Sequence, residues 1–153
     1  MSRTGQFSRE ILNKMQVKLP ALSVNEAMAR AAVAAFVSQL DPDVTEIADI
    51  KCAVSEAVTN AIVHGYRNHR ETGSIVITVT ILGGRAVKIE IKDKGCGILD
   101  VGQARQPLYT TDAAGERSGM GFTIMQSFTD KIKVRSAVGK GTTVILEKRL
   151  SSK

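Results

Sequence analysis

The chain is poor in the residues that mark several classes of protein. Its 153 residues include no tryptophan, two cysteines, three prolines and only 4% aromatic residues. Cys52 and Cys96 have neither the spacing of a metal site nor that of a disulfide framework, so we expect reduced thiols and a cytoplasmic location. No apolar run is long enough to cross a membrane, and residues 1–20 lack the apolar core of a signal peptide.

The positive charge of the chain is concentrated near its two ends. The net charge is +6, yet residues 21–130 contain ten basic and thirteen acidic side chains. Residues 1–20 contain four basic side chains and one acidic, and residues 131–153 contain seven and one. Nucleic-acid-binding proteins commonly combine clustered basic residues with aromatic ones that stack on bases. Because aromatics are scarce and the charge is split, we expect no direct binding to DNA.

The length and the hydrophobic content of 43% fit one domain with a core. We expect this domain over 14–150, after a flexible extension over 1–13. Strands are predicted over 14–21, 74–82, 85–93, 132–137 and 142–148, and helices over 22–40, 43–65 and 119–131. The order of these elements predicts a two-layer α/β sandwich, with a mixed, mostly antiparallel sheet and helices on one face.

Cap and turn residues separate these elements. Ser23 or Asn25 is expected to cap the first helix, and Gly83 with Gly84 is expected to join two strands in a tight hairpin. Residues 94–118 then lack sustained periodicity, and a loop of that length in a compact domain is usually functional or disordered.

The segment SEAVTNAIVHGY (55–66) carries polar groups on a helix face that is otherwise poor in charge. Glu56 and Asn60 stand four residues apart, opposite an apolar stripe that consists of Ile47, Ile50, Val54, Val58, Ala61 and Ile62. The polar face also includes Ala53, Thr59 and Val63. A plain solvent-facing surface would show more Lys and Arg, so we favour a covered pocket, in which a carboxylate can act as a base and an amide oxygen can bind a metal. His64 is interpreted as structural.

A second polar group follows the predicted strand in IEIKDKGCGIL. The strand ends at Asp93, and Gly95 and Gly97 come directly after it. A carboxylate in this place can accept a hydrogen bond from an exocyclic amine, and the glycines let backbone approach a flat ring closely. The alternative is an ordinary β-turn.

Two glycines also open the predicted helix in ERSGMGFTIM. Gly119 and Gly121 would leave free N–H groups at the positive helix end, where phosphate oxygens bind. The pattern is neither a P-loop nor a Rossmann fingerprint. Arg117 precedes it and can reach a terminal phosphate, and Thr142 and Thr143 begin the last strand.

Taken in order, E-x-x-x-N, D-x-G-x-G, a long loop, G-x-G and G-T-T resemble the GHKL (Bergerat-type) ATPases. SEAVTNAIVHGY, ARQPLYTT and ERSGMGFTIMQSF are similar to the bacterial anti-sigma factor serine kinases, above all to the sporulation, sigma-F type, over roughly 14–150. The resemblance implies the Bergerat fold, with ATP between the helix layer and a flexible lid at about 98–118.

The resemblance also implies roles for individual residues. Glu56 would be the catalytic base and Asn60 the Mg²⁺ ligand, and Asp93 would bind the adenine amine. The other nucleotide-binding residues would be Gly95, Gly97, Thr111, Arg117, Gly119 and Gly121, together with Thr142 or Thr143 near the adenine. Glu26 and Arg30, on the first helix, would contact partner proteins. Cys96 departs from the family, which usually has an aliphatic residue there, and is interpreted as a small hydrophobic residue.

The implied function is twofold. A homodimer would bind a sporulation sigma factor and keep it from RNA polymerase, and with ATP it would phosphorylate a serine of an anti-anti-sigma factor. One alternative is a general-stress, sigma-B type kinase, and another is a module that binds ATP and the sigma factor without catalysis. The presence of Glu56 argues against the second alternative. No membrane partner is expected.

Overall fold

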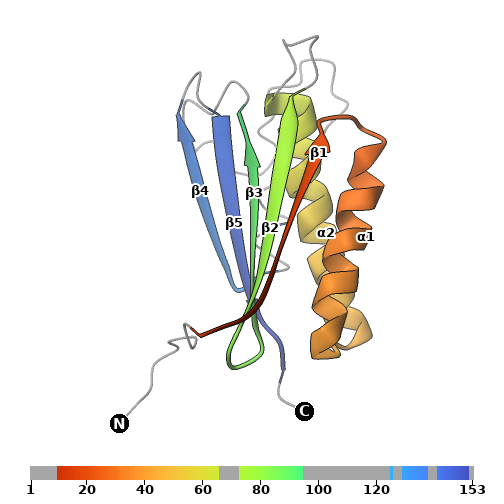
Figure 1. Ribbon diagram of the computed structural model, residues 1–153, viewed down its shortest axis with the longest axis vertical. Helices are drawn as coiled ribbons and strands as arrows, with labels where there is room; N and C mark the ends of the chain where they lie inside the picture. Colours follow the sequence, from red (N-terminus) through yellow and green to blue (C-terminus); the bar gives the residue numbers. More distant parts are fainter. Residues whose placement is uncertain (1–9, 66–72, 95–124, 126–128, 138–140, 152–153) are drawn as a thin grey trace.

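The protein is described here by a computed structural model, which defines residues 10–65, 73–94, 125, 129–137 and 141–151. Figure 1 shows two layers, with both labelled helices on one face of a sheet; the face that carries no described helix is called the open face. The helices are α1 (Asn25–Val37), continued by the 3₁₀ turn η1 (Ser38–Leu40), and α2 (Val44–Asn60), continued by the π-helical turn η2 (Ala61–Gly65). None of the helices in these ranges is long and apolar enough to cross a membrane.

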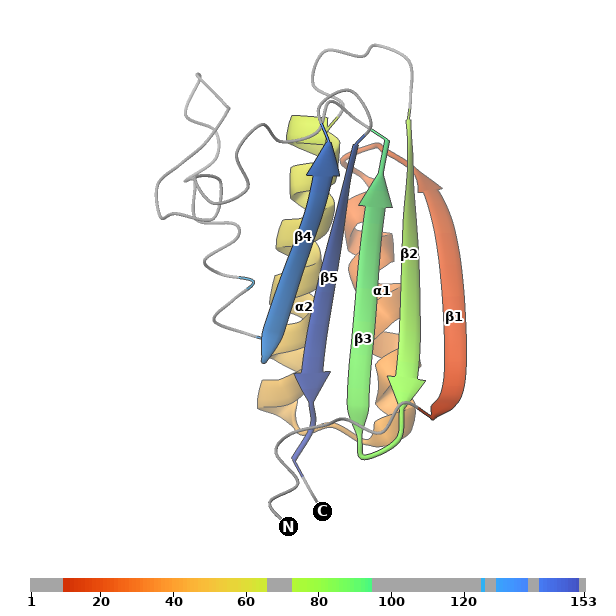
Figure 2. The ribbon, with the colours of Figure 1, turned by 90° about the vertical axis from the view of Figure 1, so that its left-hand side faces the viewer.

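The sheet has five strands in the order β1-β2-β3-β5-β4 (Figure 2). Their bounds are β1 (Ile11–Pro20), β2 (Ser74–Leu82), β3 (Ala86–Asp93), β4 (Lys131–Ala137) and β5 (Gly141–Arg149). The predicted two-layer sandwich is confirmed. The sheet is simpler than the mixed one expected, because every neighbouring pair among these five strands is antiparallel.

The two helices begin in different ways. A capping box starts α2: the Asp43 carboxylate accepts a hydrogen bond from the Glu46 N–H at 2.7 Å, and Glu46 Oε1 accepts one from the Asp43 N–H at 3.0 Å. The predicted cap of α1 by Ser23 or Asn25 is wrong. Val24 is the N-cap and makes no side-chain cap bond, while Asn25 Nδ2 donates to the carbonyl of Pro20 at 2.9 Å and so ties the helix to the end of β1.

The strands extend somewhat differently from the prediction. β1 starts at Ile11, within the predicted extension, because it continues to pair with β2 as far as Leu82. The hairpin loop has three residues rather than two, since Leu82 pairs with Ala86 and Arg85 lies in the turn with a φ of 62°.

We call this end of the sheet, with the hairpin, the start of α2 and Ser151, the hairpin end. Arg85 holds its left-handed conformation through three bonds: Nε donates to the Ser151 carbonyl at 2.7 Å, Nη1 donates to the Leu40 carbonyl at 2.8 Å, and its own carbonyl accepts from the Leu150 N–H at 2.9 Å. Glu46 Oε2 accepts a further bond from the Ser151 N–H at 2.7 Å. Burial raises the pKa of Glu46, but the N–H bonds from Asp43 and Ser151 and the charge of Arg85 outweigh it, so the pKa lies below its usual range.

The core lies between the helices and the inner face of the sheet. Alternation along β3 places Val87, Ile89 and Ile91 in the core while Lys88, Glu90 and Lys92 face away from the helices. Ala53 is fully buried, so its predicted position on the polar face of α2 is wrong. The reason is that α1 packs against α2, which gives α2 two covered sides instead of one.

Candidate functional site

Two predicted site residues lie side by side where β3 ends and β5 begins. Asp93 is the last residue of β3 and pairs directly with Thr142 of β5. Both are buried, with 5% and 9% of their surface exposed. They stand two residues from Ile91 and Val144, which belong to the core, so both turn toward the helix layer.

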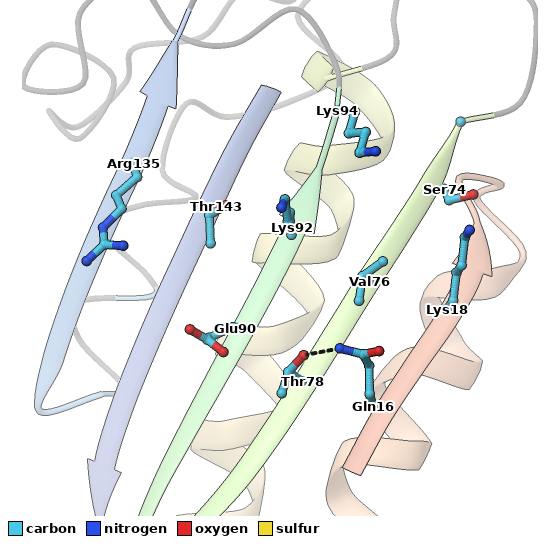
Figure 3. A pocket seen from close by; sticks show the side chains of 11 residues that line it. Gln16, Lys18, Ser74, Val76, Thr78, Glu90, Lys92, Lys94, Arg135 and Thr143 are labelled. Carbon is cyan, nitrogen blue, oxygen red and sulfur yellow. Dashed lines mark hydrogen bonds between the residues drawn. The ribbon is translucent and has the colours of Figure 1, made fainter. Parts of the chain in front are cut away.

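The side chain of Thr143 points to the opposite face of the sheet, away from the helices. It lines a hollow on the open face of the sheet together with Lys92, as Figure 3 shows. The two candidate threonines are therefore separated by the sheet itself, and Thr142 is the one that accompanies Asp93. Ser136 of β4 supports Thr142, because the two hydroxyl oxygens lie 2.9 Å apart and share a hydrogen bond.

Gly141 allows this close arrangement. Its φ of 102° is one that residues with a side chain rarely adopt. A Cβ at this position would collide with the carbonyl oxygen of Asp93 and would lie 2.6 Å from the Cα of Lys94. In the sequence this glycine is notable only as part of the G-T-T motif, and no local pattern indicates its contact with the end of β3.

The helix layer contributes Glu56 and Asn60. Both are partly buried on α2, among the buried residues Ala57, Val58 and Ala61. Asn60 is the last residue before the π turn η2, which contacts β3 and β5. π turns inside helices are frequent at functional sites. The end of α2 and the end of β3 thus lie at the same end of the molecule (Figure 2), which we call the site end.

A polar contact connects α1 to the segment that carries Glu56. Arg30 forms an ion pair with Glu26, with Nη1 and Oε1 3.1 Å apart. The hydroxyl of Ser55 donates a hydrogen bond to the same Oε1. Ser55 immediately precedes Glu56, so the two predicted partner-binding residues are bonded to the helix of the predicted base. The sequence offered no signal for this contact, since Ser55 and Glu26 belong to different helices.

The remaining predicted residues lie outside the described parts of the chain, and their roles stay predictions: Gly95, Gly97, Thr111, Arg117, Gly119 and Gly121, with Cys96 and the lid at 98–118. Within the predicted helix 119–131, Met125 is described. Its side chain is fully buried in the core, and its carbonyl accepts a hydrogen bond from the Thr129 hydroxyl at 2.6 Å.

The donors at the site end suit a hard cation better than a soft one. Among the residues with defined positions, no group of three or more His, Cys, Asp or Glu side chains could hold a metal by itself. The amide oxygen of Asn60 is an oxygen donor. Mg²⁺ typically takes one or two protein ligands of this kind and completes its shell with phosphate oxygens and water, so this amide fits a nucleotide-bound Mg²⁺.

Comparison with solved structures supports the fold. The chain is similar to the structure of the RsbU and RsbW domains of Rv1364c from Mycobacterium tuberculosis, with a TM-score of 0.68 and 24% identity over 92% of this chain and 33% of that one. It is also similar to the blue-light activated histidine kinase EL346 of Erythrobacter litoralis, with a TM-score of 0.56 and 21% identity over 79% of this chain and 40% of that one.

Sequence relatives are considerably more similar. The anti-sigma F factor of Geobacillus sp. (strain WCH70) is 54% identical over 91% of this chain and 94% of its own length. The anti-sigma F factor of Priestia megaterium is 51% identical over 92% of this chain and 95% of its own length. The histidine kinase-like ATPase domain family matches residues 19–148. The chain therefore belongs to the histidine kinase-like ATPase family and, within it, to the family of the anti-sigma F factors.

Proposed function

We propose that the chain is an ATP-dependent protein serine kinase that also binds and inhibits a sigma factor of the sigma-F type. The observation that carries this proposal is the arrangement at the site end, where Glu56 and Asn60 share a face of α2 and Asp93 pairs with Thr142 on the inner face of the sheet. Membership of the anti-sigma F family supports it.

The nucleotide would lie between the end of α2 and the ends of β3 and β5. Asp93 would accept a hydrogen bond from the adenine amine, and Thr142 rather than Thr143 would stand beside it, because Thr143 lines the opposite face. The remaining contacts are proposed on sequence alone: Gly95 and Gly97 beside the base, and Thr111, Arg117, Gly119 and Gly121 at the phosphates.

Glu56 would take the proton of the substrate serine hydroxyl. The serine oxygen then bonds to the γ-phosphorus, the bond from that phosphorus to the bridging oxygen breaks, and ADP leaves with the electron pair. Asn60 would hold Mg²⁺, which when bound neutralises charge on the phosphates. The burial of Ala57, Val58 and Ala61 around these two side chains would fix the helix face that presents them.

The N-terminal half of α1 is the proposed site for the sigma factor and the anti-anti-sigma factor. Glu26 and Arg30 form an ion pair on the side of this helix that faces α2, where 22% and 42% of their side-chain surfaces are exposed. Val24 and Met28 lie on the outer side and are 76% and 56% exposed, and exposed apolar residues are common at protein–protein interfaces. We propose that the chain acts as a homodimer.

Transfer of radiolabelled γ-phosphate tests the proposal. Proteins that co-purify with the chain from native extract, with ATP or with ADP, are incubated with labelled ATP. We expect a sigma factor and a small protein labelled on serine, and Glu56→Ala should slow the labelling by at least about 10²-fold while ATP still binds. Glu147→Ala, on the open face of the sheet, is the control and should label at the wild-type rate.

Three results would change the assignment. Labelling by Glu56→Ala at the wild-type rate would exclude this residue as the base. ATP binding and sigma-factor capture without labelled serine would indicate the non-catalytic module. Capture of a general-stress sigma factor in place of a sporulation one would indicate the sigma-B type kinase.

A further inference from the structure

The open face of the sheet carries a large excess of positive charge. Its outward positions include two acidic side chains, Glu90 and Glu147, and nine basic ones, which are Lys14, Lys18, Lys88, Lys92, Lys94, Lys131, Lys133, Arg135 and Arg149. The resulting net charge of +7 exceeds the +6 of the entire chain. All other residues together are therefore slightly acidic, and the basic character of the protein resides on this one face.

The topology creates this concentration. The basic segments near the two ends of the sequence become β1 and the β4–β5 pair, which lie on opposite sides of β2 and β3 in a single sheet. Strand alternation then turns their charged residues away from the helices, and β3 adds Lys88, Lys92 and Lys94 from the middle of the chain. Figure 2 shows this face of the sheet toward the viewer, with the described helices α1 and α2 behind it.

A hollow of about 710 Å³ lies on this face. Val76, Thr78 and Thr143 line it together with the longer side chains of Lys18, Lys92 and Arg135 (Figure 3). Gln16 Nε2 donates to the Thr78 hydroxyl at 3.2 Å and so orders one side of the hollow.

Three of the cations around the hollow, Lys18, Lys92 and Arg135, have no ion-pair partner among the described residues. Glu90 pairs instead with Lys88, at 3.6 Å. Unpaired cations of one sign gathered around a recess attract an anionic ligand, and they raise its association rate most at low ionic strength.

We propose that this face, with the hollow in its half toward the site end, is a docking surface for an acidic segment of a partner protein. A chain of Asp and Glu side chains can match cations distributed over several strands, and its smaller residues can enter the hollow. The proposal goes beyond the kinase and sigma-binding function and does not depend on it.

Other anionic occupants fit less well. Single-stranded nucleic acid usually requires aromatic side chains for base stacking, and none of the five strands contains Phe, Tyr or Trp. A second copy of this face would place like charges together. A bilayer is flat and would leave the hollow unfilled.

Fluorescence anisotropy with a labelled peptide of Asp, Glu and Ser tests the proposal in the intact chain. We expect binding that weakens as salt rises, because exposed charges are screened. The same peptide with Asn and Gln in place of Asp and Glu should not bind. Lys92→Glu and Arg135→Glu should each weaken binding by about tenfold. The matched control is Lys51→Glu, which makes the same change of charge on exposed α2, in the helix layer.

Any of the following results would overturn the proposal. One is that the peptide does not bind, or that Lys51→Glu weakens its binding as much as Lys92→Glu does. Another is that single-stranded DNA or phosphatidylserine vesicles bind more tightly than the peptide in the same buffer, or that sedimentation shows a changed oligomeric state in the Lys92 and Arg135 variants. A midpoint of thermal unfolding equal to that of the wild type in all three variants would show that the loss of binding does not come from loss of the fold.

Discussion

The two ends of the sheet keep their polar residues in place by different means. At the hairpin end, the side chains of Arg85 and Glu46 bind the backbone of Leu40 and Ser151 directly. At the site end, strand pairing places Asp93 beside Thr142, the Ser136 hydroxyl shares a hydrogen bond with Thr142, and a glycine without a side chain lets β3 and β5 come together. The comparison suggests that changes at the hairpin end will reduce stability, whereas changes at the site end will reduce ligand binding as well.

The largest effect is expected from the two glycines with left-handed backbone. Gly141→Ala should lower the free energy of unfolding by about 3 kcal/mol, because the new Cβ collides with the backbone of Asp93 and Lys94. Gly84→Ala, in the hairpin, meets only the end of the Arg149 side chain, at 3.6 Å, and should cost about 1 kcal/mol. Urea unfolding measures both.

Nucleotide binding separates the two glycine variants further. At a temperature where both are folded, Gly141→Ala should bind ATP more weakly, since Asp93 must move, and Gly84→Ala should bind like the wild type. Equal ATP affinity in both variants would show that the site end does not depend on the approach of β5 to Asp93.

Arg85→Ala should lower the free energy of unfolding by about 2 kcal/mol, because it removes two hydrogen bonds to backbone carbonyls. Arg85→Gly loses the same bonds but adopts a φ of 62° without strain, so it should be about 1 kcal/mol more stable than the alanine variant. Thermal unfolding ranks the two. The reverse ranking would mean that the turn conformation stores no strain.

The pH dependence of stability tests Glu46. Its pKa in the folded protein is lower than its ordinary value of 4.5, so its stabilisation is complete above that value and is lost as the pH falls through the folded pKa. Glu46→Gln should therefore lower stability by about 1–2 kcal/mol at neutral pH, and by less in acid. Chemical unfolding from acid to neutral pH measures the stability difference between Glu46→Gln and the wild type, with Glu90→Gln as the control. A stability difference that does not change with pH would contradict the lowered pKa of Glu46.

Ser55→Ala should have the smallest effect on stability, about 1 kcal/mol, because it removes one hydrogen bond between α1 and α2. If that bond transmits partner contacts on α1 to Glu56, the variant should lower the rate of serine phosphorylation at saturating protein substrate while ATP affinity stays constant. Ser55→Thr, which keeps the hydroxyl, should restore the rate. Equal rates in the alanine variant and the wild type would confine Ser55 to a structural role.

Local patterns were sufficient for much of the fold. Alternation along β2, β3 and β5 and the helical periodicity of α2 each depend on residues close in sequence, so the layers and the position of Asp93 could be predicted. The prediction that the site binds a nucleotide depended on the order of the motifs and on their resemblance to a family. Neither Glu56 nor Asp93 alone was sufficient for this prediction.

What the sequence did not reveal depends on contacts between distant segments. The burial of Ala53 requires α1 against α2, and the bond from Ser55 to Glu26 requires the same pair. The role of Gly141 appears only when β5 lies beside β3. The sequence showed positive charge split between the two ends of the chain, and only the strand order shows that β1 and the β4–β5 pair carry part of it on one surface.

The position of β5 has a consequence for synthesis of the protein. This last strand lies between β3 and β4, and it supplies Val144 and Leu146 to the core. While the ribosome still holds residues 141–151, β4 has no neighbour in the sheet, Asp93 lacks Thr142, and Glu46 lacks the N–H of Ser151. The five-stranded sheet, the Asp93–Thr142 pair and the Glu46–Ser151 bond can therefore form only after residues 141–151 have left the ribosome.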